Sequence, residues 1–286
     1  MRTINRPVFV ALAIVAFVGL TACRNSGSTT TTPEGAVPPG GSAPAGATTT
    51  IRGYVNSGLK GSMTPLIAAY RKVAPKVTVT AEYLSAKEIT DRLAKGDKPD
   101  FVVDGFSNLS KNASHRLAGT KDVAYGIDFI QIAVKAGNPK GITDLKPFGA
   151  DSATKSALCA SEEPCGKVGV AVLTGQGITP APDAFGDEPS GLVADLVSGQ
   201  IDVALLFRSD VKAYGTDKLA GIDVPGAERG EQTFQLMLVK KTAESMAFAT
   251  FVDNDKLAES TLTKVGLRPL AAAAAKPAAA PTTVRR

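Results

Sequence analysis

The fold is decided by residues 51–88, which read IRGYVNSGLKGSMTPLIAAYRKVAPKVTVTAEYLSAKE. The stretch begins with a short apolar strand, and apolar residues then recur at helical spacing as far as Val73. Apolar and polar residues alternate over 77–83, which predicts a second strand. Ser85 and Glu88 have the spacing of a capping box, so a second helix is expected to begin at Ser85. Strand, helix, strand and helix in succession predict an α/β protein.

The same alternation of elements continues outward from this stretch. Strands are expected at 51–56, 77–83, 101–103, 129–134, 201–206 and 234–239, and helices over 63–73, after Ser85, at 192–197 ending near Gly199, and over 246–262. One stretch is ambiguous, because 167–173 has the β-branched content of a strand while Val168, Ala171 and Val172 share one helical face. Periodicity alone leaves both interpretations open there.

The N-terminus carries a basic and then apolar leader. Arg2 and Arg6 precede an apolar stretch at 8–20 that is too short to span a bilayer comfortably. The leader ends in Leu-Thr-Ala-Cys at 20–23, which resembles the lipobox of bacterial lipoproteins, and this implies a signal peptide over 1–22 and lipidation of Cys23. We therefore expect a protein on the extracytoplasmic face of the cell membrane, held by a lipid anchor. An ordinary secretory leader that happens to carry a cysteine is the alternative.

Both ends of the remaining chain are low in complexity. Residues 23–50 are rich in Ser, Thr, Pro, Gly and Ala and predict a disordered spacer, and 271–286 form an Ala/Pro tail. The leader, the spacer and the tail carry the whole formal net charge of +5. The region between them is formally neutral, which gives no support to nucleic-acid binding. It contains about 220 residues, enough for one large domain or two lobes.

Cysteine use agrees with export. Cys159 and Cys165 remain once Cys23 is lipidated, and an even pair in an oxidising compartment predicts a disulfide. A metal site or a thiol nucleophile is the alternative, but the chain has a single histidine, His115, in a polar stretch that predicts a solvated position. One histidine leaves no credible Cys–His or Ser–His catalytic arrangement. We expect no enzyme activity, no metal and no cofactor.

Short motifs along the chain carry a resemblance to a known family. They are Asn56-Ser57-Gly58, Ser85 after the second strand, Pro99-Asp-Phe-Val-Val103, Ala136-Gly-Asn-Pro139, Pro164-Cys-Gly166, Ser198-Gly-Gln-Ile-Asp-Val-Ala204 and Gly266-Leu-Arg-Pro-Leu270. Their order resembles that in the periplasmic molybdate-binding proteins of ABC transporters, which are type II solute-binding proteins. The resemblance covers essentially all of 51–270, and the Cys-x5-Cys loop looks like that of actinobacterial members.

The resemblance implies two α/β lobes with a ligand cleft between them and closure by hinge bending. By analogy, the first lobe comprises 51–127 and 226–270, and the second comprises 128–225. The resemblance also implies a helix, not a strand, over 167–173. A monomer that delivers molybdate or tungstate to an ABC transporter permease is the function that follows.

In such a cleft, Ser hydroxyls and backbone amides are expected to hold a tetrahedral oxyanion. Ser85 corresponds to a serine that donates its hydroxyl in the family, and its alternative role is a plain helix N-cap. The family's first serine falls on Ser57 or Gly58, with Ser62 as a substitute. Cys165 aligns with a backbone amide donor.

Two aligned positions depart from the family. Phe207 stands where a tyrosine hydroxyl reaches the anion, and Pro189, next to Ser190, has no N–H where an amide donor aligns. Each unmade hydrogen bond to a buried anion costs about 1–3 kcal/mol. Another small anion, an organic solute, or a structural or adhesive lipoprotein that kept the fold without binding are therefore the alternatives. The absence of Trp disfavours sugars and quaternary amines.

Overall fold

The computed structural model describes residues 48–105, 108, 122–150, 152–224 and 230–269. The expected leader with Cys23, the spacer up to residue 47, His115 and the tail at 271–286 lie outside these residues. The spacer was expected to reach residue 50, but the first strand already begins at Thr49, because Thr49 pairs with Val77. In the part of the chain that is described, no helix is long and apolar enough to cross a membrane.

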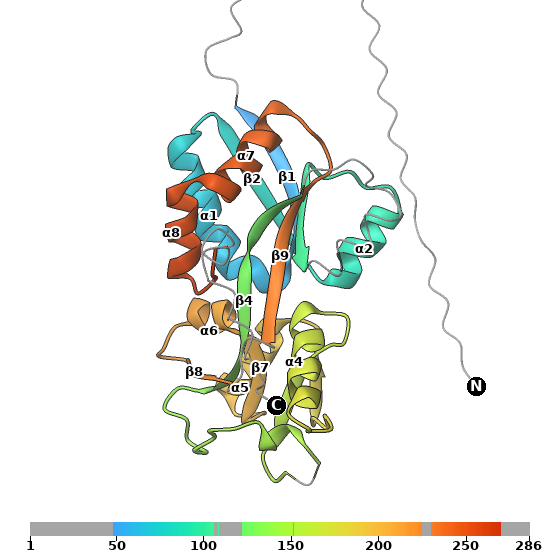
Figure 1. The fold of residues 1–286 in the computed structure, drawn as a ribbon, viewed down its shortest axis with the longest axis vertical. Helices are drawn as coiled ribbons and strands as arrows, with labels where there is room; N and C mark the ends of the chain where they lie inside the picture. Colours follow the sequence, from blue (N-terminus) through green and yellow to red (C-terminus); the bar gives the residue numbers. More distant parts are fainter. Residues whose placement is uncertain (1–47, 106–107, 109–121, 151, 225–229, 270–286) are drawn as a thin grey trace, which may run out of the picture. The chain divides into compact units, whose positions relative to one another are not determined.

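Strands and helices alternate along the chain (Figure 1). The strands are β1 (Thr49–Asn56), β2 (Val77–Leu84), β3 (Phe101–Gly105), β4 (Asp122–Lys135), β5 (Ser156–Cys159), β6 (Ala184–Gly186), β7 (Val203–Phe207), β8 (Leu219–Asp223) and β9 (Glu231–Leu238). The helices are α1 (Lys60–Val73), α2 (Ala86–Ala94), α4 (Pro164–Gly175), α5 (Pro189–Ser198), α6 (Arg208–Tyr214), α7 (Ala243–Asn254) and α8 (Lys256–Lys264), with short 3-10 turns η1 (Ser57–Leu59) and η2 (Lys146–Phe148).

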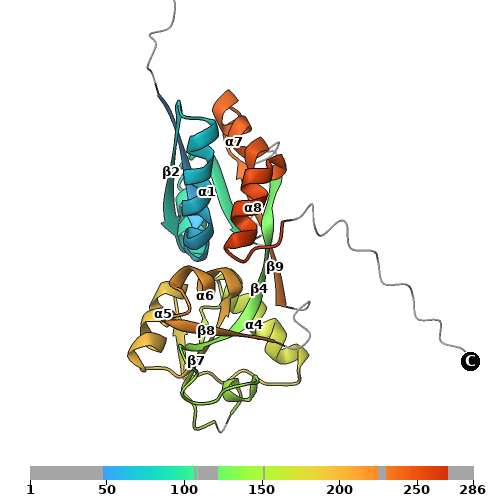
Figure 2. The same ribbon diagram turned by 90° about the vertical axis from the view of Figure 1, so that its left-hand side faces the viewer.

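The strands form two sheets that share β4. In the first sheet the order is β2-β1-β3-β9-β4, where β1 is parallel to β2 and β3, and β9 is antiparallel to β3 and β4. In the second sheet β4 pairs with β7 and β8, and β7, β5 and β6 follow in parallel. The partner of β4 changes from β9 to β7 between Phe129 and Ile130. β4 thus passes from one sheet to the other (Figure 2).

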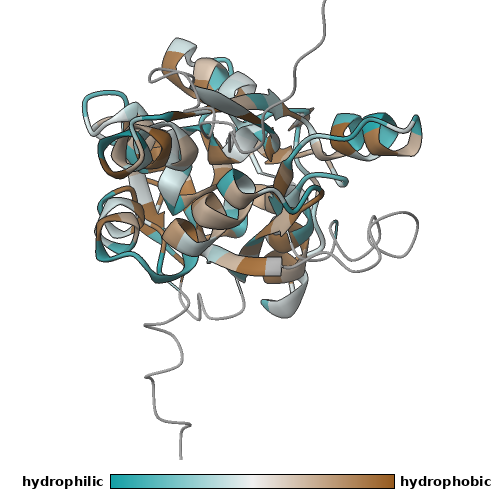
Figure 3. Ribbon diagram, turned by 90° about the horizontal axis from the view of Figure 1, so that it is seen from above, coloured by the Kyte–Doolittle hydropathy of each residue, from teal (hydrophilic) through white to brown (hydrophobic). Residues whose placement is uncertain are grey.

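Helices cover both faces of the first sheet. Alternate residues of its strands point to opposite faces: Val55 and Val103 belong to the larger core with α1, α7 and α8, whereas Tyr54 and Val102 belong to a smaller core beneath α2. Coloured by hydropathy, the inner strands are largely hydrophobic and the outlying loops largely hydrophilic (Figure 3). In the second sheet the buried strands pack against α4, α5 and α6. The expected α/β arrangement in two parts is therefore present.

Several predictions about local structure are confirmed, and others are wrong. Residues 164–175 form helix α4, so the helix that the resemblance implied is present there. α5 ends at Ser198, and the cap that follows is Gly199, whose φ of 81° suits glycine. The single helix expected over 246–262 is in fact α7 and α8, because Asp255 ends the first and caps the second, accepting from the Leu257 N–H at 2.7 Å. No strand or helix was predicted for β5, β6, α6 or β8, all of which are short.

The boundaries of the lobes stay a proposal. The first expected boundary, 127/128, is two residues before the position where β4 changes partner. The second, 225/226, lies outside the described residues.

Candidate functional site

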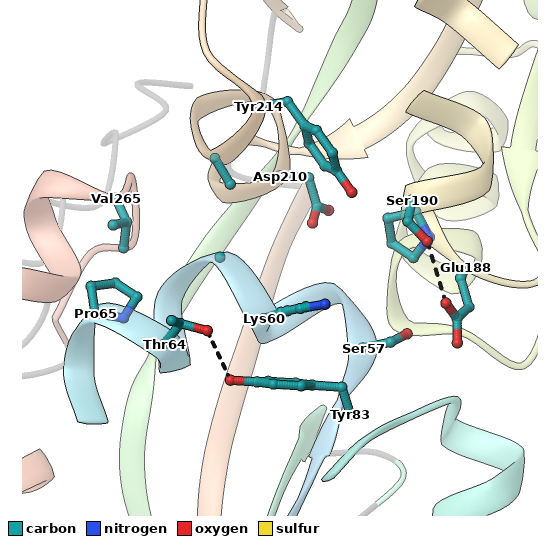
Figure 4. Close-up of a pocket in the computed structure, with 13 residues that line it drawn as sticks. Ser57, Lys60, Thr64, Pro65, Tyr83, Glu188, Ser190, Asp210, Tyr214 and Val265 are labelled. Carbon is teal, nitrogen blue, oxygen red and sulfur yellow. Dashed lines mark hydrogen bonds between the residues drawn. The ribbon is translucent and has the colours of Figure 1, made fainter. Parts of the chain in front are cut away.

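A cavity of about 720 Å³ lies between elements of the first and the second sheet (Figure 4). We call it the hydroxyl cavity, because hydroxyl groups are the commonest polar groups in its lining. Its lining residues are Ser57, Lys60, Gly61, Thr64, Pro65, Tyr83, Glu188, Pro189, Ser190, Asp210, Ala213, Tyr214 and Val265. Figure 4 shows Ser57, Lys60, Thr64 and Tyr83 on one side, and Asp210, Tyr214, Ser190 and Glu188 facing them.

The first-sheet side of the hydroxyl cavity offers donors to a ligand. The Ser57 hydroxyl is buried and has no hydrogen-bond partner. The Lys60 ammonium lies 5.7 Å from the centre of the Tyr83 ring, and the Tyr83 hydroxyl is 3.0 Å from that of Thr64. Lys60 is the only lysine or arginine among the described residues of this lining. An anion that enters here meets one positive charge and an unused hydroxyl.

The second-sheet side carries acids. Ser190 donates to the Glu188 carboxylate at 3.3 Å. Asp210 is 6% exposed, and one of its carboxylate oxygens has no partner. Burial raises the pKa of Asp210 well above its usual range, and the neighbouring Asp128 carboxylate raises it further. A protonated Asp210 is a hydrogen-bond donor and removes one negative charge from the cavity.

A second cavity, of about 460 Å³, lies on the other side of Glu188, which lines both. We call it the acidic cavity. It is lined by Ser85, Lys87, Glu88, Ala160, Glu162, Glu163, Asp187 and Glu188. Five of these are acids and one is a lysine, and Lys87 is already paired with Asp91 at 2.6 Å. With the Glu163 carboxylate in place, this lining repels a dianion.

The contact of Glu163 with the first sheet closes the cleft beside the acidic cavity. Glu163 lies just before α4 and is 3% exposed. Its Oε1 accepts from the Ala86 N–H at 2.9 Å, and its Oε2 accepts from Asn56 Nδ2 at 3.0 Å. Burial raises the pKa of Glu163, and these two hydrogen bonds oppose that shift. The carboxylate therefore joins β1 and α2 to the loop between β5 and α4.

The structure divides the expected site residues between these places. Ser57 and Pro189 line the hydroxyl cavity, and Ser85 lines the acidic one. The predicted capping box of Ser85 is confirmed: its Oγ accepts from the Glu88 N–H at 3.2 Å, and its hydroxyl is 3.3 Å from Oε2 of the same residue. Cys165 lines neither cavity, and its sulfur lies 2.11 Å from that of Cys159.

Three other positions expected in the site pack or form hydrogen bonds within the protein itself. Phe207 is 3% exposed and packs edge-on against Phe234, with ring centres 5.5 Å apart, so it lines neither cavity. Ser62, the possible substitute for the first serine, is buried and bonded to Leu59 and Tyr125. The Gly58 N–H donates to the Asn56 side chain at 3.1 Å. Of the three candidates for the first donor, Ser57 is the one with an unused hydroxyl.

Other buried acids lie near the cleft. Asp104 is fully buried and accepts from the Gly105 N–H at 2.7 Å and from Asn108 at 3.3 Å. Burial raises its pKa to about 7, and the Glu163 carboxylate adds to this. Burial likewise raises the pKa of Asp128 to about 6. Within the described ranges, no group of three His, Cys, Asp or Glu side chains could hold a metal ion.

Sequence reasoning missed Lys60, Glu163, Glu188 and Asp210. One signal was available for Glu163: it precedes Pro164 and Cys165, and proline favours the first position of a helix, so Glu163 is at a helix N-cap. A polar side chain that caps a helix from this position accepts from an N–H of its own helix. Its partners belong to distant elements, and nothing local predicts them.

Comparisons with known proteins agree with this architecture. Residues 51–268 match the family described as bacterial extracellular solute-binding protein. The chain is 23% identical over 218 residues to the molybdate-binding protein ModA of Mycobacterium tuberculosis, a match that covers 74% of this chain and 82% of that protein.

Solved structures give the same result at lower identity. The periplasmic molybdate-binding protein of Azotobacter vinelandii is similar with a TM-score of 0.62 and 16% identity, over 76% of this chain and 98% of that one. The sulfate-binding protein SubI of Mycobacterium tuberculosis has a TM-score of 0.61 and 17% identity, over 79% and 89%. At such identities these neighbours establish the fold, and they confirm the expected two-lobed periplasmic-binding architecture.

Proposed function

The chain belongs to the bacterial extracellular solute-binding proteins, and from this premise we propose that it captures a small oxyanion, molybdate or tungstate, for an ABC importer. The relatives named for molybdate support this choice of ligand. The observation that carries the proposal is the unused, buried Ser57 hydroxyl beside Lys60 in a cavity between the two sheets. Ser57 and Lys60 can both donate hydrogen bonds to an anion. The Ser57 hydroxyl is a neutral donor, and a protonated Asp210 is a neutral donor as well.

Ser85 is the second proposed hydroxyl donor, and the Cys165 amide is the proposed backbone donor. Ser85 stands at the start of α2, where the orphan N–H groups of the first turn favour an anion. Phe207 and Pro189 contribute no donor. We propose that Lys60 and Asp210 take over part of their role, because both face the hydroxyl cavity.

A larger organic anion is the second candidate. Its support is the volume of the hydroxyl cavity, about 720 Å³, which is in the range of sites for drug-sized ligands and far exceeds a single tetrahedral oxyanion. Tyr83 and Tyr214 would flank an organic group there, while Lys60 and Ser57 would hold its acidic end.

Isothermal titration of the purified protein tests these proposals. Molybdate, tungstate, sulfate and phosphate are titrated in parallel, followed by small organic acids and phosphorylated acids. Tight 1:1 binding of molybdate and tungstate, with sulfate rejected, supports the first candidate. Binding of an organic acid alone supports the second. No heat and no thermal shift with any of these solutes contradicts both and favours a lipoprotein without ligand binding.

We also propose that the mature chain begins at a lipidated Cys23, stands on the extracytoplasmic face of the cell membrane, acts as a monomer and docks on a permease. The lipobox supports the anchor. Release of a Cys23→Ala variant from the membrane into the medium tests it. We propose a disulfide between Cys159 and Cys165, because they are an even pair in an oxidising compartment, and the intact mass before and after reduction in the presence of a thiol-blocking reagent tests it.

A further inference from the structure

The carboxylate of Glu163 does not cap the helix that it precedes. Glu163 is the N-cap residue of α4, yet its side chain makes no cap hydrogen bond. Both carboxylate oxygens instead reach the first sheet, where Ala86 and Asn56 donate to them at 2.9 and 3.0 Å. The contact is buried, so water does not replace it readily.

The two donors suit an anion. The Ala86 N–H belongs to the first turn of α2, so it has no partner within the helix and lies at the positive end of the helix dipole. The orientation of Asn56 is fixed, because its Oδ1 accepts from the Gly58 N–H at 3.1 Å, and its Nδ2 therefore faces Glu163. The Ala86 N–H and the Asn56 Nδ2 group both point at Glu163, so its side chain has to accept two hydrogen bonds. A carboxylate accepts from both, whereas a neutral amide would direct its own N–H₂ at Asn56.

We infer that Glu163 is an internal anion that occupies the donors at the start of α2 and holds the two sheets together until a solute anion displaces it. Ser85, one of the proposed donors to the oxyanion, directly precedes Ala86, so an oxyanion held by Ser85 would meet the same donors as Glu163. Two anions cannot share these donors, because like charges a few ångströms apart repel each other strongly in a buried site. The identity of the competing solute rests on the proposed function, but the contact itself does not.

Competition of this kind determines specificity. A solute must accept hydrogen bonds from Ala86 and Asn56 more strongly than Glu163 does. The displaced carboxylate must then be solvated or bonded elsewhere. Beyond burial, the Glu188 carboxylate raises the pKa of Glu163, and the Glu163 carboxylate in turn raises the pKa of Asp104. Lys167 on α4 opposes both shifts. Anions that bind these donors more weakly than Glu163 does are therefore rejected.

Amide hydrogen exchange in the absence of ligand tests the contact directly. Because Glu163 is the partner of the Ala86 N–H, Glu163→Ala should speed exchange at Ala86 at least tenfold. Glu259→Ala, which removes an exposed acid from α8, is the matched control and should leave Ala86 unchanged. Glu163→Gln guards against a folding defect, because it keeps an acceptor for Ala86 and should give an intermediate rate. Equal exchange at Ala86 in the wild type and both Glu163 variants overturns the inference.

Titration with molybdate tests the competition. Glu163→Ala and Glu163→Gln should bind molybdate at least tenfold more tightly than the wild type, with Glu259→Ala unchanged. Equal affinities in all four proteins overturn the inference even if Ala86 exchange responds, because Glu163 then does not compete. Absence of binding in all four counts against the proposed function, and the exchange result alone then decides whether Glu163 is the internal anion.

Discussion

The two cavities beside Glu188 differ in how far the protein satisfies its own polar groups. In the acidic cavity, Ser85 is bonded to Glu88, and the Ala86 N–H at the start of α2 is bonded to Glu163. In the hydroxyl cavity, the Ser57 hydroxyl and one oxygen of Asp210 have no partner. Buried polar groups are normally bonded, so two unused ones that line the same cavity are open to a ligand. The comparison indicates that one half of the cleft is already occupied by the chain and the other half is available.

The largest expected effect concerns the acids beside the occupied half. Asp104 has a folded pKa of about 7 against 3.8 for the ordinary group, with Glu163 and Lys167 as its charged neighbours and Asn108 as a hydrogen-bond donor. Below pH 4, both the folded and the unfolded chain carry the proton. Between pH 4 and 7, only the folded chain keeps it, so Asp104 lowers stability as pH rises, and the loss is complete above pH 7.

Replacing Asp104 by Asn should therefore raise the free energy of unfolding at pH 8 by on the order of 2–4 kcal/mol and flatten the decline between pH 4 and 7. Urea unfolding across this pH range measures both effects. Asp253→Asn, an exposed change near the end of α7, serves as the control with an unaltered slope. A variant as unstable at pH 8 as the wild type would show that Asp104 is not a source of strain beside Glu163.

The next effect concerns the contact between α1 and α6 beside the hydroxyl cavity, the available half of the cleft. A Cβ on Gly61 of α1 would lie 2.5 Å from the Cβ of Ala213 on α6, so these helices meet only because residue 61 is glycine. Gly61→Ala should lower molybdate affinity about 10–100-fold, since overpacking costs about 1–3 kcal/mol and opposes closure. Isothermal titration measures the loss. Gly191→Ala in α5, where nothing lies within 4 Å, should leave the affinity unchanged, and an equal loss in both variants would contradict the argument.

The parts of this fold that could be predicted are those with local causes. The capping box of Ser85 depends on residues three positions apart, and the strands and helices of the first lobe depend on alternation and helical spacing. Short elements such as β6 and α6 contain too few residues to show a period. The break between α7 and α8 has a local cause in Asp255, but the apolar spacing continues across it and predicts one helix.

The site was less predictable because its contacts are long-range. Glu163 is 107 positions from Asn56 and 77 from Ala86. The resemblance placed the start of α2 and the loop before α4 on the same cleft, and both segments line the acidic cavity, but it said nothing of an acid between them. The unused state of Ser57 also depends on packing, since the neighbouring Ser62 looks equivalent in the sequence and is fully bonded.

Lys60 tests whether charge draws the anion to the available half. Lys60→Ala should lower molybdate affinity about tenfold, because charged hydrogen bonds contribute about 1.5–3 kcal/mol and solvent screens this exposed group. The loss should shrink as salt concentration rises. Lys72→Ala, an exposed change near the other end of α1, is the control and should alter affinity less than twofold. Equal losses would mean that only the overall charge of the protein matters.

The smallest effect separates the two serines of this region. Ser57→Ala should lower molybdate affinity about fivefold, the equivalent of about 1 kcal/mol for one neutral hydrogen bond, without lowering stability, because its hydroxyl has no partner in the folded chain. Ser62→Ala should do the reverse. It leaves the Tyr125 hydroxyl buried without its 2.9 Å partner, which costs about 1–3 kcal/mol of stability, while molybdate affinity stays the same. Thermal unfolding and titration of both variants measure this crossed pattern. A loss of affinity in Ser62→Ala alone would move the first donor of the site from Ser57 to Ser62 and would remove the reason for treating the hydroxyl cavity as the available half of the cleft.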